Sequence, residues 1–245
     1  MNGGEPGGTV AVRKRYIDFS RGQVHLRMGG AGPPVVLLHD SPRSSVMHRG
    51  NFAWLAGEFT VYALDTPGYG NSTPLPAEPA PTIPDFAAAL EECIAALGLG
   101  APAVYGFHTS SKIALALATR PQAPMGGAVL DGLSLPPTLP TEEFIRRYML
   151  PFEVRDDGSH LATQWSKVLD FHRWFPWFSR TAETRLAMDL PDDAALHEYG
   201  LDTLMAGASW SSAYAAAMRY TAREAFDRVR RPLTVTCRED DVLFG

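Results

Sequence analysis

Short apolar runs alternate with helical segments up to residue 130, and this alternation restricts the possible folds more than any other feature of the sequence. The apolar runs are Val35–Leu38, Phe59–Leu64, Ala103–Tyr105 and Gly127–Leu130. Such runs are typical of strands buried on both faces of a parallel sheet. Helices are predicted between them, at 51–57, 83–97 and 111–119, and a strand pair is predicted earlier, at 12–19 and 23–28. This order indicates right-handed βαβ units, and therefore an α/β fold with a mostly parallel sheet flanked by helices.

A different pattern follows Leu135, because no strand is evident again until Pro232–Cys237. The residues between them are rich in proline and tryptophan, and helices are predicted near 141–150, 161–173 and 194–220. A helical block inserted between two strands of an α/β core is typical of a cap. We therefore expect a flexible leader at 1–9, a core at 10–135 and 221–245, and a helical cap at 136–220.

The overall composition argues against several classes of function. A formal net charge of −5 disfavours nucleic acids and anionic membranes as partners. No apolar run approaches the roughly 20 residues of a transmembrane helix, and residues 1–9 lack the apolar region of a signal peptide, so we expect a cytoplasmic protein. The seven histidines are scattered, and Cys93 and Cys237 are expected to pack in the core, Cys237 at the end of a buried strand. We therefore expect no metal and no other cofactor.

Three motifs occur where predicted strands end, namely His39–Pro42, Asp65–Ser72 and Gly106–Ser110. Together they resemble the α/β-hydrolase superfamily, most closely its epoxide-hydrolase and haloalkane-dehalogenase-like branch. The resemblance covers 13–245 and implies an α/β-hydrolase fold with a helical cap. In that branch the third motif is the turn that carries the catalytic nucleophile. Such a sharp strand-to-helix turn needs small neighbours, which Gly106 supplies.

The sequence departs from the family pattern at several positions. His108 stands where the family places Ser, Cys or Asp, Asp40 stands where it has glycine, and Ser110 replaces the second glycine of the turn. The sequence also stops at Gly245, before the strand, helix and histidine-bearing loop that the family adds. Either the sequence is a piece of a longer product, which we favour, or the chain lacks the usual base.

The resemblance assigns roles to individual residues. His108 is expected to act as a general base or a nucleophile, oriented by Asp241, and the N–H groups of Ser41 and Thr109 are expected to form the oxyanion hole. The helix N-terminus is expected to lower the pKa of His108 and keep its imidazole neutral. A substrate pocket is expected to be lined by further residues, namely Asp40, Phe107, Trp165, Trp174, Trp177 and Trp210. The alternative for these aromatic residues is that they pack the cap onto the core.

These expectations point to a hydrolase for a small, partly apolar ester, lactone or epoxide. Two alternatives stay open: a catalytically degenerate protein that binds a small apolar ligand, and a cofactor-free lyase or isomerase that uses the same site. A small-molecule substrate is the expected partner, and a homodimer is an open option.

Overall fold

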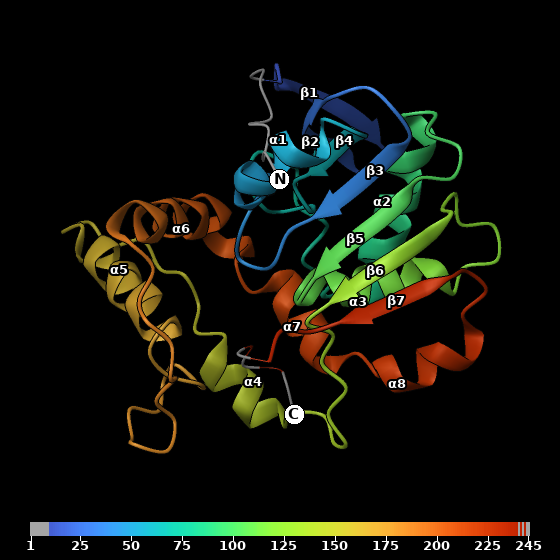
Figure 1. The fold of residues 1–245 in the computed structure, drawn as a ribbon. Helices are drawn as coiled ribbons and strands as arrows, with labels where there is room; N and C mark the ends of the chain where they lie inside the picture. Colours follow the sequence, from blue (N-terminus) through green and yellow to red (C-terminus); the bar gives the residue numbers. More distant parts are fainter. Residues whose placement is uncertain (1–9, 240, 242, 244–245) are drawn as a thin grey trace, which may run out of the picture.

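The computed structural model describes residues 10–239, 241 and 243, and their strands form one sheet (Figure 1). The strand order is β1-β2-β4-β3-β5-β6-β7. Strand β2 is antiparallel to both of its neighbours, β1 and β4. In the order of the sheet, all neighbouring strands from β4 to β7 are parallel. The bounds are β1 (Arg13–Phe19), β2 (Gly22–Gly29), β3 (Pro34–Leu38), β4 (Thr60–Leu64), β5 (Ala103–Phe107), β6 (Gly127–Asp131) and β7 (Leu233–Thr236). The predicted α/β fold with a mostly parallel sheet is confirmed.

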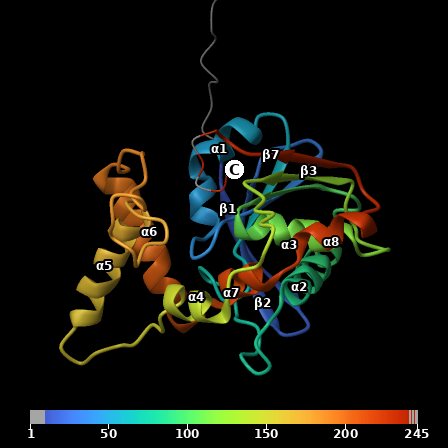
Figure 2. The same cartoon turned by 90° about the horizontal axis from the view of Figure 1, so that it is seen from below.

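Helices cover both faces of the sheet (Figure 2). On one face lie α2 (Ile83–Ala96), α3 (Thr109–Ala118) and α8 (Ala222–Ala225), and on the other lies α1 (Arg49–Leu55). Side-chain alternation along β3 explains the two layers, because Val36 and Leu38 join the large core with α2 and α3, whereas Leu37 packs with Phe52 of α1. The central strands are therefore buried on both faces, as their apolar sequences indicate.

The prediction that β7 is a buried strand is wrong. Thr234, Val235 and Thr236 are exposed, and Cys237 is only partly buried. The reason is its position: among the described residues β7 is one of the two edge strands of the sheet and pairs only with β6.

The helices between β6 and β7 form two groups. In Figure 1, α4 (Glu142–Tyr148), α5 (Ser159–Phe171) and α6 (Asp193–Ala206) lie to one side of the sheet, and α5 packs against α6. In contrast, α7 (Ser212–Arg219) packs against α2 and α3 in the main core. The division into a core and a cap at 136–220 stays a prediction. None of the described helices combines the length and the apolar character that a membrane crossing requires.

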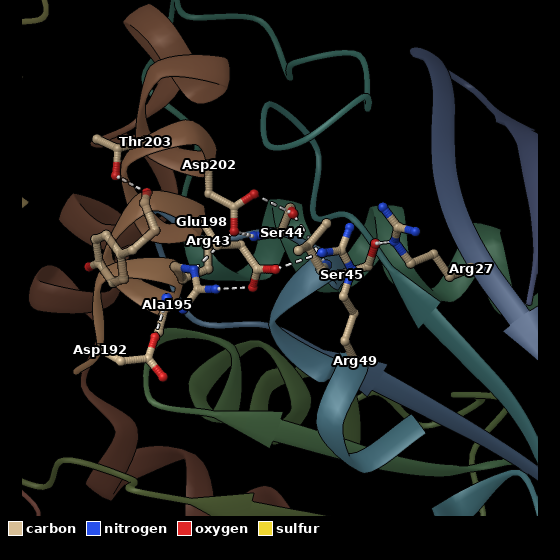
Figure 3. Close-up of polar contacts among 12 residues, drawn as sticks. Arg27, Arg43, Ser44, Ser45, Arg49, Asp192, Ala195, Glu198, Asp202 and Thr203 are labelled. Carbon is tan, nitrogen blue, oxygen red and sulfur yellow. Dashed lines mark hydrogen bonds and ion pairs between the residues drawn. The ribbon is translucent and has the colours of Figure 1, made fainter. Parts of the chain in front are cut away.

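A polar cluster joins α6 to the loop that follows β3 (Figure 3). The Arg43 guanidinium donates to Asp202 at 2.9 Å and to Glu198 at 3.1 Å. The hydroxyl and the backbone N–H of Ser44 also donate to Asp202, at 2.7 and 3.3 Å. Asp202 is buried, so these bonds are shielded from water. They fix α6 against the loop that begins at His39.

Replacing Asp202 with alanine is expected to destabilise the protein by about 2–3 kcal/mol, because Arg43 and Ser44 would lose their buried acceptor. The control is Arg49→Ala, which removes an exposed ion pair with Glu198 in the same cluster and should cost less than about 1 kcal/mol. Urea denaturation measures both free energies of unfolding. Equal losses in the two variants would contradict the role given to Asp202.

Candidate active site

A strained turn between β5 and α3 carries His108. Its φ is 48° and its ψ is −109°, and it is the only non-glycine residue with positive φ among the described residues. Such a conformation costs about 1–3 kcal/mol and is often found at functional sites. Gly106 makes the turn sterically feasible, since a Cβ there would lie 2.4 Å from the carbonyl oxygen of Ser110.

Ser110 stabilises this turn from within. Its hydroxyl donates to the carbonyl of Leu38 at 3.0 Å and accepts the N–H of Phe107 at 2.9 Å. The side chain is fully buried, so it cannot reach a substrate. The side chain that stays partly exposed at the centre of the turn is that of His108, where the sequence motif places it.

Two carboxylates flank the His108 ring. The Nε2 atom lies 2.8 Å from Oδ2 of Asp241, and Nδ1 lies 3.6 Å from Oδ2 of Asp40. One face of the ring stacks on Phe107, with 3.9 Å between ring centroids. Space for the ring depends on Gly132, where a Cβ would lie only 2.2 Å from Cδ2 of His108.

The expected low pKa of His108 is wrong. Burial does lower the pKa, but hydrogen bonding to Asp241 and to Asp40, together with their negative charges, raises it to about 10. The two nearby carboxylates outweigh the helix N-terminus, whose effect is typically below about 1 kcal/mol at partly exposed sites. The same pairing lowers the pKa of Asp241, against the effect of burial. At neutral pH the ring is therefore an imidazolium between two carboxylates.

Asp40 also occupies part of the expected oxyanion hole. The N–H of Thr109, at the start of α3, donates to Oδ1 of Asp40 at 3.4 Å. Ser41 and Thr109 both lie in the wall of the same cavity as Asp40. The N–H of Thr109 thus donates to the side chain of Asp40, in the place where the sequence analysis expects a substrate oxyanion.

Neighbouring polar residues hold the Asp40 loop in place. His39 is buried and its Nδ1 donates to the carbonyl of Asp40 at 2.7 Å, while its Nε2 accepts the N–H of Thr66 at 2.8 Å. The buried Asp65 carboxylate accepts the N–H groups of Ser45 and Asn71. These residues stabilise the loops after β3 and β4 and do not reach the cavity.

A cavity of about 680 Å³ opens beside Asp40 and His108. Its walls come from the loop after β3, from the start of α3, from the helices and loops between β6 and β7, and from Leu243. The part between β6 and β7 includes the aromatic side chains of Phe144, Tyr148, Phe171, Phe175, Tyr199 and Tyr214. Lys112 of α3 also lines it. A chamber of this volume and character fits a small, partly apolar molecule.

The predicted tryptophan lining of the pocket is wrong. The cavity wall contains none of Trp165, Trp174, Trp177 and Trp210, nor does it contain Phe107. Trp177 and Trp210 are buried, and their indole N–H groups donate to the carbonyls of Tyr148 and Leu150. Trp165 is 42% exposed. The two buried indoles therefore bond to the backbone near the end of α4, and the alternative, that the aromatic residues pack a cap onto the core, stays a prediction.

Sequence reasoning missed Lys112 and the phenylalanines and tyrosines of the wall. Lys112 follows His108 by four residues, so one turn of helix could have indicated that it shares the face of His108. The aromatic residues carried no comparable signal, because their places depend on how α4 to α6 fold over the sheet. Within the described part of the chain, no cluster of three His, Cys, Asp or Glu side chains could hold a metal ion.

Comparisons with known proteins agree with this architecture. Residues 33–232 match the family described as alpha/beta hydrolase fold. Haloalkane dehalogenase 2 of Mycobacterium tuberculosis is 31% identical over 116 residues, which are 47% of this chain and 40% of that protein. The (E)-2-((N-methylformamido)methylene)succinate hydrolase of Acinetobacter baylyi is 32% identical over 105 residues, or 42% and 39% of the two chains. The chain thus matches about two fifths of the length of these curated relatives.

Solved structures share the fold at lower identity. A hydrolase from Pseudomonas aeruginosa has a TM-score of 0.70 at 17% identity, and the match covers 95% of this chain and 82% of that hydrolase. An epoxide hydrolase from an endophytic Streptomyces has a TM-score of 0.67 at 21% identity, with 92% of this chain covering 79% of it. At these identities the similarity establishes a common fold.

Replacing Asp241 with asparagine is expected to lower the pKa of His108 from about 10, because Asp241 supplies its closest hydrogen bond. The pKa of His108 is higher in the folded protein than its ordinary value of 6.5, so protonation of His108 stabilises the folded state. This contribution is fully present below pH 6.5 and is lost as the pH rises through about 10. Nuclear magnetic resonance titration of the labelled ring measures the pKa in both proteins. A titration midpoint unchanged by the substitution would rule out the Asp241 contact in solution.

Replacing Gly106 with alanine is expected to destabilise the protein by about 1–3 kcal/mol, because the new Cβ would overlap the backbone of Ser110. Gly50→Ala is the matched control: it lies in α1, where an added Cβ would meet no atom within 4 Å, so it should stabilise by about 0.5–1 kcal/mol. Calorimetric unfolding gives both values. A Gly106→Ala variant with an unchanged free energy of unfolding would mean that the turn has more space than these contacts imply.

Proposed function

Because the chain belongs to the α/β-hydrolase fold family, we propose that it is a hydrolase whose substrate, a small and partly apolar ester, lactone or epoxide, binds in the cavity beside His108. The observation that carries this proposal is the row of charges Asp40, His108 and Asp241 at one end of the cavity. It combines a proton acceptor and a proton donor within reach of one bound molecule, as general acid–base catalysis requires.

The charge state of the site assigns the roles within this proposal. A pKa near 10 leaves His108 protonated at neutral pH, so it serves as a general acid rather than as the free base or nucleophile that the sequence suggests. Asp40 is the carboxylate of the cavity wall that lies beside His108, and it accepts a proton from water in this proposal. Asp241 holds the ring through Nε2 and leaves Nδ1 directed toward Asp40.

Hydrolysis of an ester or lactone then needs two proton transfers. Asp40 takes a proton from a water molecule as the water oxygen attacks the carbonyl carbon. When the carbon–oxygen bond to the leaving group breaks, His108 donates its Nδ1 proton to the leaving oxygen. Asp40 then returns its proton to Nδ1 of His108, 3.6 Å away. Protonation of Asp40 weakens its hold on the Thr109 amide, which, with the amide of Ser41, is proposed to stabilise the developing oxyanion.

One observation favours a second candidate, a protein that binds a small ligand without turning it over. Asp40 accepts the N–H of Thr109, and this contact competes with an oxyanion for the donor. A binding protein would retain the cavity and its aromatic wall but gain nothing from the proton donor at His108.

An assay of hydrolysis separates the two candidates: ethyl hexanoate, a γ-lactone and an epoxide are offered as substrates, and the product formed from each is measured. Asp40→Asn and His108→Gln are each expected to lower kcat by about 10²–10⁴. The control is Lys167→Met, which changes a buried lysine that does not line the cavity. With His108 as acid, kcat falls as pH rises through about 10.

Two other outcomes would contradict the proposal. A kcat that instead rises through about pH 10 would make neutral His108 the base. No turnover above background in the wild type, with the ester still bound in the cavity, would support the ligand-binding protein.

A further inference from the structure

Lys112 is a buried cation in the wall of the cavity. It lies on α3, four residues after His108, and only 6% of the residue is exposed. Its Nζ donates to the carbonyl of Ala217 at 2.9 Å, and both residues line the cavity. An ammonium group has three hydrogens to donate, so the bond to Ala217 leaves hydrogens of this group for a further acceptor.

Among residues 10–239, 241 and 243, no carboxylate forms an ion pair with Lys112, whose ammonium group bonds to the carbonyl of Ala217. Burial lowers its pKa to about 8. A buried charge without an opposite charge is costly, and a bound anion reduces that cost. A protein that needed only packing at this position could hold a methionine there without the cost.

The other charged and titratable groups of the wall supply no unpaired cation for an anion. The tyrosines of the wall are uncharged, because burial raises the pKa of each phenol. Asp40 is already beside the His108 imidazolium, and Asp189 is exposed to solvent. Burial lowers the pKa of His172, so this ring is neutral at pH 7, and its Nδ1 donates to the carbonyl of Val168. Among the described residues of the wall, His108 already has carboxylate partners and Lys112 is the cation without one.

We infer that the cavity takes a substrate with an apolar body and a single carboxylate, and that this carboxylate pairs with Lys112. The aromatic wall, including Phe144, Phe171 and Phe175, accommodates the apolar body. One ammonium group matches one monovalent anion, whereas a phosphate dianion would leave charge unbalanced. This inference rests on the proposed function, because it names the substrate class for the same cavity, and Lys112 acts in it as a binding residue.

Calorimetric titration with octanoate and with octanamide tests the inference, since the two probes share an alkyl chain and differ in charge. The wild type is expected to bind octanoate about tenfold or more tightly than octanamide at pH 7, as a charge-assisted bond implies. Lys112→Met should remove this preference while octanamide still binds, which also reports an intact cavity. Lys167→Met is the matched control, because Lys167 is a buried lysine packed over Trp210 and outside the cavity wall, and it should keep the preference.

A pH series on the wild type gives a second test that needs no variant. Octanoate binds the protonated form, so its advantage should decline as pH rises above about 8, where free Lys112 loses its proton. An advantage that persists to about pH 10 would assign the anion to His108 instead and overturn the inference. Equal binding of the two probes, or a preference retained by Lys112→Met, would overturn it as well.

The outcomes separate this inference from the proposed function. If the chain is not a hydrolase, neutral esters are not turned over, but the octanoate preference and its loss in Lys112→Met still appear. If only the inference fails, ethyl hexanoate is still hydrolysed in a manner that depends on Asp40 and His108, while octanoate shows no preference.

Discussion

The close approach of the backbone at Gly106 and Ser110 is the constraint on which the candidate site depends. It lets β5 pass into α3 within two residues, and it forces His108 into a positive φ. The strain is held by two bonds of the Ser110 hydroxyl, one to Phe107 within the turn and one to Leu38 of β3. The side chain at its centre therefore points outward at the start of a helix, with Gly132 leaving room for the ring. A strained residue held this firmly is best explained by a functional requirement.

The parallel sheet then brings the ionisable groups together. Asp40 follows β3, His108 follows β5 and Asp241 follows β7, so all three lie beyond the carboxyl ends of parallel strands. Ligand sites of α/β sheets typically occur at this edge. The proximity of the two carboxylates, rather than the helix N-terminus, sets the charge of His108, which remains an imidazolium at neutral pH. This charge is the reason that His108 is proposed to donate a proton rather than to attack as a neutral ring.

The helices between β6 and β7 complete the cavity and are attached to the same loop that carries Asp40. The buried Asp202 of α6 binds Arg43 and Ser44, three and four residues after Asp40 (Figure 3). The position of the aromatic wall and the position of Asp40 are thus coupled through one polar cluster. Lys112 contacts the carbonyl of Ala217 on α7 and adds a cation to this apolar chamber. The result is a cavity with a charged end and an apolar body.

The sequence by itself determined the sheet, the turn and the place of His108. Apolar runs, helical periodicity and the small residue at Gly106 are local signals, since each depends on a few neighbouring residues. Three features were decided only by the tertiary structure: the protonation of His108, the exposed edge position of β7, and the composition of the cavity wall, where phenylalanines, tyrosines and Lys112 replace the predicted tryptophans. Each arises from residues far apart in the chain. A pKa reflects every charge within a few ångströms, and a cavity wall reflects how separate helices pack, neither of which a local pattern contains.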